Sequence, residues 1–426
     1  MSETVFTYAA PRLKFGSGAI TEIGHDVAAL GGRRVLVVTD AGIAAAGHPE
    51  RVAGALRSAG LEAVVHDSAR VEPSDASLRA AHERAVADGP FDAVVALGGG
   101  SSIDTAKAVS LLLSNPGELM DYVNAPVGGG RAPERPVLPV VAVPTTTGTG
   151  SESTTICVLD VLDLHVKTGI SHERLRPVLA VVDPDLMLSQ PAGVTAAAGM
   201  DILCHALESW TARPYTSYER KRPEQRVPYC GANPIADMWA ERSMRLLASS
   251  FRRAVADGSD TVARGEMALA ATFAGLGFGN AGVHIPHADA YPIAGQVHDL
   301  ATDFRPEGYD VTEPMVPHGM AVALTAPEAF AFTFDADPAR HLAAADLLDP
   351  DRDAGGEGPG RLPAVLRSLM RDIGMPSGLA EVGYTDSHVD GLVEGAVKQE
   401  RLLATAPKEV RPEDLAAVIR GSLHHW

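Results

Sequence analysis

The chain has 426 residues, and its 54 acidic side chains outnumber its 36 basic ones, which gives a net charge of −18. Hydrophobic residues make up 46% and charged residues 21%, a balance that is typical of globular proteins and excludes wholesale disorder. Because nucleic acids and anionic membranes are negatively charged, so acidic a protein is expected to bind neither of them. The length suits two or three domains.

The three cysteines, Cys157, Cys204 and Cys230, are widely spaced and form no Cys-x-x-Cys pair. This spacing argues against a disulfide framework and against a thiolate zinc site, and it favours a reducing compartment. The chain has no run of about 18 apolar residues that could span a bilayer. Its first residues lack the basic flank and apolar stretch of a signal peptide. We therefore expect a cytoplasmic protein.

Up to about residue 190, short β-branched runs alternate with helical stretches. The strand candidates are 34–39, 62–65, 91–97, 137–143 and 178–182. The helix candidates between them are 49–59, 74–88 and 103–113. Continuous apolar strands separated by helices predict a parallel sheet that is covered on both faces.

After Pro191 the strand pattern stops and stretches that allow amphipathic helices follow. These stretches are 194–212, 234–256, 262–275, 338–347, 361–373 and 412–423. We therefore predict an α/β domain over residues 1–190 and an all-helical domain over residues 191–426. The cleft between two such domains is the expected active site.

A glycine-rich turn, 98–101, follows the strand candidate 91–97 and leads into a predicted helix. Glycines let a ligand approach the backbone, and a helix N-terminus offers free N–H groups to a phosphate. The spacing does not match the G-x-G-x-x-G fingerprint of dinucleotide sites. A plain tight turn explains this segment about as well as a binding turn.

A second turn, 144–152, contains four threonines and two glycines after another strand candidate. It offers donors to a phosphate or a ribose, or it simply caps a helix. Since ligands bind beyond the carboxyl ends of parallel strands, two such turns at one sheet edge favour a binding site there. Asp40, directly after strand 34–39, can accept from a ribose hydroxyl and repel a 2′-phosphate, or it can serve as a turn residue.

The helical half contains a candidate metal site. Asp201 and His205 are four residues apart, which places them on one face of a helix. Two further histidine segments follow, at 284–287 and 316–319. One carboxylate with two or three imidazoles suits Fe²⁺ or Zn²⁺. An isolated histidine is usually structural, so the interpretation depends on several such segments occurring in one half of the chain.

On these motifs, the chain resembles the iron-containing alcohol dehydrogenases over nearly its whole length, and within them the hydroxyacid–oxoacid transhydrogenase branch. The matching stretches are 98–107, 144–152, 199–209, 233–239, 273–291, 316–319 and 383–384. The resemblance implies a dehydroquinate-synthase-like fold, with an N-terminal nucleotide-binding α/β domain and a C-terminal helical metal domain.

The resemblance also implies a set of site residues. The implied metal ligands are Asp201, His205, His287 and His318. The implied cofactor-binding residues are Asp40, Gly99, Gly100, Ser101, Asp104, Thr145, Thr146, Thr149 and Lys167. The implied cofactors are NAD(H) or NADP(H), with NAD(H) favoured by Asp40, and a divalent Fe²⁺ or Zn²⁺.

The segment after the third implied ligand departs from the family pattern. Many members place another histidine four residues after His287, where this chain has Tyr291. Tyr291 and His284 are the expected candidates for further catalytic roles such as a proton relay, although His284 can equally be a structural loop histidine. Asp289 is expected to add negative charge near the metal and to alter its preference.

The resemblance implies that the metal acts as a Lewis acid on the substrate oxygen while hydride passes between the substrate and nicotinamide. In the transhydrogenase branch the reduced cofactor stays bound, and the substrates are 4-hydroxybutyrate and 2-oxoglutarate. The locally basic segment 213–226 is a candidate anchor for such carboxylates, or else a solvated loop. We expect a homo-oligomer, specifically a dimer.

Three alternatives stay open at this point. One is an NAD(P)-dependent alcohol dehydrogenase or aldehyde reductase that acts on another small molecule, such as a phosphonate aldehyde. Another is a lyase of the dehydroquinate-synthase type, which shares the implied fold. The third is a noncatalytic relative that binds a metal or a nucleotide.

Overall fold

The computed structural model describes every residue of the chain except His165 and Asp310. Its internal contacts divide the chain into two units. The first half of the chain, Ala10–Leu188, forms the sheet unit, and Ser189–Trp426 together with Met1–Ala9 forms the helical unit. The first nine residues thus belong with the helices, which the expected boundary at residue 190 did not anticipate.

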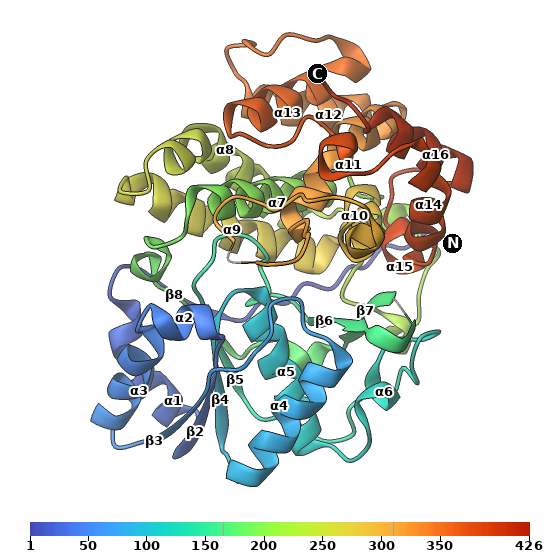
Figure 1. Ribbon diagram of the computed structural model, residues 1–426. Coiled ribbons are helices and arrows are strands. Elements are labelled where there is room, and N and C mark those ends of the chain that lie inside the picture. The colour runs from blue at the N-terminus through green and yellow to red at the C-terminus, as the bar shows by residue number, and fades with distance from the viewer. Residues whose placement is uncertain (165, 310) are drawn as a thin grey trace. The chain divides into compact units, whose positions relative to one another are not determined.

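The sheet unit is built on six parallel strands in the order β1-β8-β5-β4-β2-β3 (Figure 1). The strands are β1 Arg12–Phe15, β2 Arg34–Val38, β3 Glu62–His66, β4 Ala93–Gly98, β5 Val140–Pro144 and β8 Leu179–Val182. The parallel sheet predicted from the apolar runs is confirmed. β1 was not predicted, because its sequence Arg-Leu-Lys-Phe is short, half polar and exposed at the sheet edge.

Helices cover both faces of this sheet. The α-helices of the sheet unit are α1 Ile23–Ala29, α2 Ala41–Ala45, α3 His48–Ser58, α4 Asp75–Asp88, α5 Gly100–Ser114 and α6 Leu119–Tyr122. Successive residues of β2 point to opposite faces. Val35 and Val37 therefore join a core with α1 and α3, whereas Leu36 and Val38 join one with α4 and α5.

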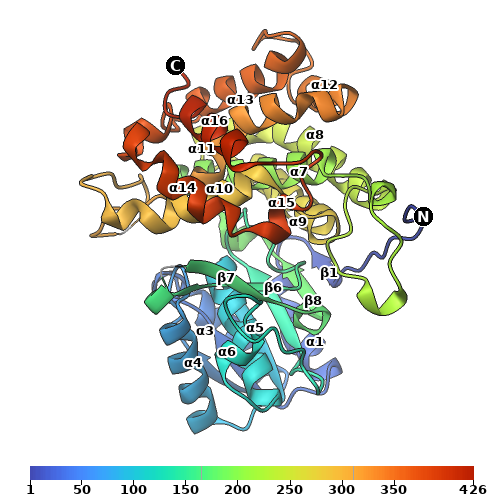
Figure 2. The same cartoon turned by 90° about the vertical axis from the view of Figure 1, so that its right-hand side faces the viewer.

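A separate antiparallel hairpin, β6 Ile156–Val161 and β7 Val166–Ser171, lies next to α5 (Figure 2). Asp160 and Lys167 face each other across this hairpin in its register. The hairpin was not predicted, because charged and polar side chains interrupt the apolar runs of its two strands.

The helical unit is formed by ten α-helices in the described part of the chain. They are α7 Ala192–Thr211, α8 Pro234–Ala256, α9 Thr261–Ala281, α10 Ile285–Gln296, α11 His318–Thr333, α12 Pro338–Leu348, α13 Arg361–Asp372, α14 Val389–Val397, α15 Glu400–Leu403 and α16 Pro412–Gly421. Short 3₁₀ turns connect several of them. The prediction of an all-helical second half is confirmed.

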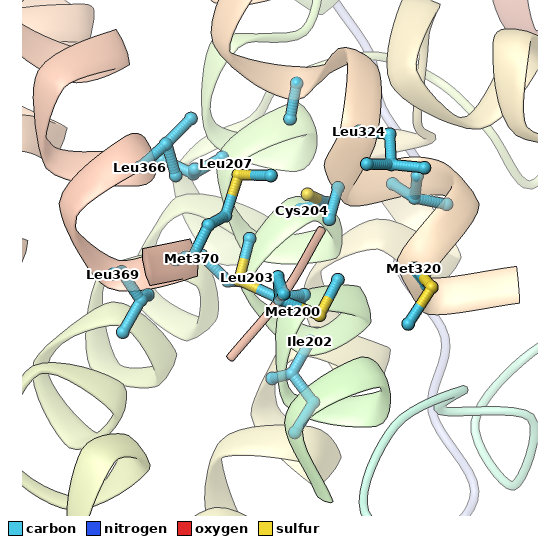
Figure 3. Close-up of a cluster of buried hydrophobic side chains, with 14 of the residues drawn as sticks. Met200, Ile202, Leu203, Cys204, Leu207, Met320, Leu324, Leu366, Leu369 and Met370 are labelled. Carbon is cyan, nitrogen blue, oxygen red and sulfur yellow. The ribbon is translucent and has the colours of Figure 1, made fainter. Parts of the chain in front are cut away.

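α7 runs through the core of this unit. Its Met200, Leu203 and Leu207 pack in one apolar cluster with α11 and α13 (Figure 3). A Cβ at Gly199 would lie 2.2 Å from the Phe251 ring, so α8 approaches α7 closely only because this position is glycine. The tight packing fixes α7 and the side chains on its other face.

Within the described residues, no single helix is long and apolar enough to cross a membrane. The segments Thr261–Ala281 and Ile285–Asp299 reach the required length and composition only as a pair, and the pair is bent by 105°.

Candidate functional site

Four side chains of the helical unit point their polar atoms at one place. The carboxylate Oδ1 of Asp201 lies 3.7 Å from Nε2 of His205, 3.4 Å from Nε2 of His287 and 3.9 Å from Nε2 of His318. Asp201, His287 and His318 offer ligand atoms that all lie within 4.8 Å of one another. The chemistry of these donors and their convergence identify a metal site.

Three helices bring these side chains together. Asp201 and His205 stand one turn apart on α7, His287 lies in the first turn of α10, and His318 is the first residue of α11. A Cβ at Gly319 would lie 2.1 Å from the carbonyl oxygen of Ala197. Only glycine therefore lets the start of α11 approach α7 closely enough for His318 to reach Asp201.

The unpaired atoms at this place fit a bound divalent cation. Oδ1 of Asp201 and Nε2 of His287 are both buried and lie 3.4 Å apart without forming a hydrogen bond of normal geometry. Buried polar atoms without partners are costly, and a cation that both atoms coordinate would remove that cost. One carboxylate with imidazoles is a donor set that Fe²⁺ and Zn²⁺ accept.

The ring of His205 is held in place by stacking. It lies parallel to the Phe278 ring at a centroid distance of 3.8 Å and near the His287 ring at 4.5 Å. Burial lowers the pKa of His205 to about 3, so its imidazole stays neutral. A neutral imidazole keeps a lone pair on one of its two ring nitrogens and so can bind a cation, and the role of His205 as fourth ligand stays a prediction.

The charges at the site are coupled. Burial raises the pKa of Asp201, but the three imidazoles around it outweigh burial and hold that pKa below its usual range. Burial lowers the pKa of His287, but the carboxylates of Glu208 and Asp201 outweigh burial and raise it to about 9. A cation that binds Nε2 of His287 has to displace any proton there.

Glu208 is a functional residue that the sequence reasoning missed. Its side chain is fully buried, and Oε2 accepts a hydrogen bond from Nδ1 of His287. Its Oε1 accepts from the backbone N–H groups of His284, at 2.7 Å, and of His287, at 3.3 Å. The carboxylate therefore fixes a metal ligand and satisfies free N–H groups at the start of α10. Its position three residues after His205, on the same helical face, could have indicated this role.

The two relay candidates differ in their surroundings. His284 is fully buried, and its Nε2 lies 3.0 Å from the hydroxyl of Thr211. Burial lowers the pKa of His284 to about 4. The ring of Tyr291 is half-buried and stacks near the His318 ring at a centroid distance of 6.0 Å.

Asp289 is fully buried. Burial raises the pKa of Asp289 well above its usual range and outweighs the opposite effect of a hydrogen bond with Thr325. Among the described residues it does not belong to the group of converging ligand atoms. The raised pKa favours the neutral form of this acid, and the effect of Asp289 on a bound metal stays a prediction.

The two predicted cofactor turns lie against each other in the sheet unit. The backbone N–H of Thr145 donates to the carbonyl oxygen of Gly98 at 3.0 Å. A Cβ at Gly99 would lie 3.1 Å from Oγ1 of Thr146, and a Cβ at Gly100 would lie 2.8 Å from Cγ2 of Thr149. Glycine thus allows the close approach of the turns.

This arrangement fits a dinucleotide. Gly99 precedes the first turn of the 15-residue helix α5 and has no side chain that could cap its N–H groups. Those N–H groups and the positive end of the helix dipole suit a pyrophosphate. Ser101, Thr146 and Thr149 line the same turns and are half-buried, and the hydroxyl of Thr145 is buried without a partner.

Two predicted cofactor residues are engaged within the protein. Asp40 accepts from the backbone N–H of Ile43 at 3.0 Å and from the hydroxyl of Ser102 at 2.9 Å, so it caps α2. Asp104 is buried and accepts from the hydroxyl of Ser151 at 2.6 Å, which fastens the second turn to α5. Direct contacts of either carboxylate with a cofactor stay predictions.

Lys167, the third such residue, is paired with two carboxylates. Its Nζ bonds to Glu72 and, at 3.1 Å, to Oδ2 of Asp160. Only 5% of its side chain is exposed. Its predicted contact with a cofactor likewise stays a prediction.

The basic segment 213–226 has structural partners. Arg226 contacts both carboxylate oxygens of Glu3 at 3.2 Å, and Arg213 lies over the Tyr218 ring at 4.6 Å. Arg226 thus ties the N-terminal residues to the loop, and Arg213 contacts a side chain within the loop itself. The idea that they anchor a substrate carboxylate gains no support from these contacts.

Comparisons with known families match most of the chain. Residues 10–184 match the family model described as iron-containing alcohol dehydrogenase. Residues 224–301 and 311–423 match the model of the C-terminal part of the Fe-containing alcohol dehydrogenase family.

Individual proteins are similar over nearly their full length. The mitochondrial hydroxyacid-oxoacid transhydrogenase of Xenopus laevis is 43% identical over 427 residues, which cover 99% of this chain and 91% of that protein. The structure of a 1,3-propanediol oxidoreductase has a TM-score of 0.84 at 30% identity and covers 98% of this chain and 100% of its own. Sulfoacetaldehyde reductase from Bifidobacterium kashiwanohense, in complex with NAD⁺, has a TM-score of 0.80 at 27% identity, with 99% of each chain covered.

Proposed function

Because the chain belongs to the iron-containing alcohol dehydrogenase family, we propose that it transfers hydride between a hydroxyacid and an oxoacid by way of a nicotinamide cofactor. The observation that carries this proposal is the full-length similarity to the Xenopus laevis transhydrogenase in a chain whose Asp201, His287 and His318 form a metal site. The proposed pair is 4-hydroxybutyrate, as hydride donor, and 2-oxoglutarate, as acceptor.

The proposed metal is Fe²⁺ or Zn²⁺, held by Asp201, His205, His287 and His318. When bound, the metal polarises an alcohol or carbonyl oxygen as a Lewis acid, and the nicotinamide carries the hydride. The protein holds the donor atoms ready: burial keeps His205 neutral, and Glu208 fixes the ring of His287.

The proposed cofactor is NAD(H), bound at the two turns of the sheet unit. Gly99 and Gly100 let the pyrophosphate approach the N-terminus of α5, and Ser101, Thr146 and Thr149 supply hydroxyl groups. The carboxylate of Asp40 would repel the 2′-phosphate of NADP(H), which favours NAD(H).

For the proton that leaves or joins the substrate oxygen, Tyr291 is the better of the two relay candidates. Its ring is half-buried and lies beside that of His318, whose side chain keeps 26% of its surface exposed. His284 is fully buried and hydrogen-bonded to Thr211. We therefore assign the relay to Tyr291 and a structural role to His284.

The test is an exchange without free cofactor. Purified protein is incubated with 4-hydroxybutyrate deuterated at C4 and with 2-oxoglutarate, and the products are analysed by mass spectrometry. We expect succinate semialdehyde and 2-hydroxyglutarate that carries deuterium at C2. Asp201→Asn, which keeps the side-chain shape but removes the charge, is the matched control and should give no labelled product.

A second candidate function is supported by the structural similarity to a sulfoacetaldehyde reductase in complex with NAD⁺. It is an NAD(H)-dependent reductase of a small anionic aldehyde, such as a phosphonate aldehyde. This candidate would be favoured if the enzyme reduced a single aldehyde with free NADH and transferred no hydride between a hydroxyacid and an oxoacid. Absence of any hydride transfer with either set of substrates would contradict both.

We also propose a cellular compartment and an oligomeric state for this protein. The described structure holds Cys157, Cys204 and Cys230 as free thiols, which suits a reducing compartment, and we propose the cytoplasm. The Xenopus laevis relative is named as a mitochondrial protein, so cell fractionation is the direct test. A homodimer is proposed, and light scattering on the purified protein would test it.

A further inference from the structure

A buried pair of side chains on α5 contacts the second cofactor turn. Asp104 and Lys107 stand three positions apart on one face of this helix, and Nζ of Lys107 lies 3.5 Å from Oδ1 of Asp104. Lys107 is completely buried, and Asp104 is 7% exposed. Taking a carboxylate and an ammonium group out of water is costly, so such a pair persists only where hydrogen bonds satisfy both groups. The partners of the pair therefore show what it holds.

Lys107 holds the segment that joins the second cofactor turn to β6, the strand next to α5 (Figure 2). Its Nζ donates to the hydroxyl of Ser151 at 2.9 Å, to the hydroxyl of Thr154 at 3.1 Å and to the carbonyl oxygen of Ile156 at 2.7 Å. These three bonds use all three protons of an ammonium group. Burial lowers the pKa of Lys107, whereas the carboxylate of Asp104 opposes that shift and favours the ammonium form.

Ser151 bridges the two members of the pair. Its hydroxyl accepts from Nζ of Lys107 and donates to Oδ1 of Asp104 at 2.6 Å. The other carboxylate oxygen of Asp104 accepts from the backbone N–H of Val158 in β6 at 2.8 Å. Because the donor of the Ser151 hydroxyl and one of its acceptor positions are both used, the pair fixes the place and the rotation of this residue.

Ser151 in turn contacts a residue that is proposed to bind the cofactor. Its backbone N–H donates to Oγ1 of Thr149 at 3.3 Å. A hydroxyl that accepts a hydrogen bond still has its own proton to donate. A Cβ at Gly100 would lie 2.9 Å from Oγ1 of Thr149, so this hydroxyl stands against the first residue of α5. The N–H groups of that helix start are the proposed seat of the pyrophosphate.

We propose that Asp104 and Lys107 are positioning residues that act through Ser151 to hold the Thr149 hydroxyl at the N-terminus of α5, where it donates to the pyrophosphate of the dinucleotide. The assignment rests on the proposed use of NAD(H). It gives Asp104 an indirect role, whereas the resemblance implies a direct contact with the cofactor.

A double-mutant cycle tests whether the pair acts through Thr149. Lys107→Met keeps an unbranched side chain but cannot donate to Ser151, and we expect NADH to bind about tenfold more weakly, the equivalent of one hydrogen bond. Thr149→Val replaces the hydroxyl with a methyl group and should weaken binding by a similar factor. Because both changes remove the same contact, K107M/T149V should bind NADH within about twofold of the weaker single variant. Fluorescence titration measures each affinity.

Ser151→Ala tests the bridge with a smaller change. It removes the hydroxyl that joins the pair to the turn, but it leaves both members of the pair in place. We expect it to weaken NADH binding in the wild type and to have little further effect in the Thr149→Val variant. If Lys107→Met does not fold, this second cycle tests the same coupling.

The matched control is Lys14→Met. Lys14 also belongs to the sheet unit and also contacts carboxylates, those of Glu22 and Asp26 at 2.7 Å each, but these partners belong neither to the cofactor turns nor to α5. This variant should bind NADH as the wild type does. Thermal unfolding of every variant records the loss of stability, which a merely structural pair would cause without any coupling to Thr149.

Two outcomes would overturn the assignment. If Lys107→Met weakens NADH binding by the same factor in the wild type and in the Thr149→Val variant, the pair does not act through Thr149. If Lys107→Met or Thr149→Val binds NADH as the wild type does, the pair only supports the fold. Failure of the wild type, freed of any co-purified nucleotide, to bind NADH would instead refute the proposed cofactor, and this assignment with it.

Discussion

The carboxylate of Glu208 decides which nitrogen of His287 is free for a cation. Because Oε2 accepts from Nδ1, the ring keeps a proton on Nδ1, and a cation that displaces the proton of Nε2 finds that lone pair on the side of Asp201. We predict that Glu208→Ala binds its divalent metal about 10- to 100-fold more weakly, since outer partners of metal ligands typically contribute that much. Competition with a chelating dye measures the affinity.

Glu208→Gln is the matched control for this prediction. Its amide oxygen can still accept one hydrogen bond at the start of α10, so we expect a smaller loss of metal affinity than in Glu208→Ala. The circular dichroism spectrum of both variants checks that the helices are intact. Wild-type metal affinity in Glu208→Ala would show that the buried carboxylate is only a structural cap.

Gly100 allows the contact between the two cofactor turns. An alanine Cβ there would lie 2.8 Å from Cγ2 of Thr149, so one turn would have to move. We predict that Gly100→Ala weakens NADH binding about tenfold or more and destabilises the fold by about 1–3 kcal/mol, the usual cost of overpacking. Fluorescence titration and urea unfolding measure the two effects.

Gly54→Ala provides the comparison in the same unit. Gly54 lies within α3, and a Cβ at this position meets no atom within 4 Å. Alanine favours helix over glycine by about 1 kcal/mol, so this variant should be slightly more stable and bind NADH normally. Equal NADH affinities in the two variants would mean that the turns do not hold the cofactor.

Site residues could be predicted from the sequence where they lie close together on one helix, because the helix itself then fixes their relative positions. Asp201 and His205 lie four positions apart, so one helix brings them together whatever surrounds it. The approach of His287 and His318 depends on how α10 and α11 pack against α7, which no local pattern contains. Glu208 was missed because a glutamate within a helical sequence is usually a solvent-exposed residue, and the sequence does not show that this one is buried beside His287.

At the scale of elements, the buried strands were the most predictable because their apolar runs are continuous. β4 and β5 are buried at every residue, which leaves an unmistakable pattern. α10 and α11 were not predicted: each contains an internal proline, Pro292 or Pro327, and each is apolar on most of its surface. A helix that is buried all round lacks the amphipathic period on which prediction depends.

The second cofactor turn contains a buried acid, Glu152, whose protonation should couple its stability to pH. Burial raises the pKa of Glu152 to about 7 from an ordinary value of 4.5. The folded state therefore binds the proton more tightly than the unfolded state, and this favourable contribution is lost as the pH rises from about 4.5 to 7. We predict that Glu152→Gln, which stays neutral, gains stability over the wild type across this range.

The gain should level off above pH 7 at about 3 kcal/mol, since it accumulates at about 1.4 kcal/mol per pH unit between the two pKa values of about 4.5 and 7. Urea unfolding at several pH values between 5 and 8 measures it. Glu83→Gln, at an exposed position of α4 in the same unit, reports the effect of removing one negative charge from an acidic protein. A difference between Glu152→Gln and the wild type that does not change with pH would contradict the buried-acid interpretation.

At the scale of the whole molecule, the change from strands to helices near residue 190 follows from the sequence pattern, but the place of the first nine residues does not. Their attachment depends on single contacts with distant positions, such as the bond from the N–H of Ala9 to Oδ1 of Asn280 at 2.9 Å. Neither composition nor periodicity encodes a partner 271 positions away.

All four proposed metal ligands come from the helical unit, so metal binding should stabilise that unit selectively. A ligand that binds only the folded state stabilises it by about 4 kcal/mol when its free concentration is about 1,000 times Kd. We predict that chelation of the metal accelerates amide hydrogen exchange in α7, α10 and α11, while β2, β4 and β5 of the sheet unit change little. Hydrogen-exchange mass spectrometry resolves these segments in one experiment.

NADH should stabilise the sheet unit and not the helical unit, because its proposed contacts lie in the turns after β4 and β5. Added to metal-free protein, it should slow exchange at the start of α5 and leave the metal-binding helices unaffected. Asp201→Asn, which lacks the charged ligand, should lose the response to metal but keep the response to NADH. If chelation instead loosened both units equally, or Asp201→Asn still responded to metal, the cation would have to bind somewhere other than at Asp201, His287 and His318.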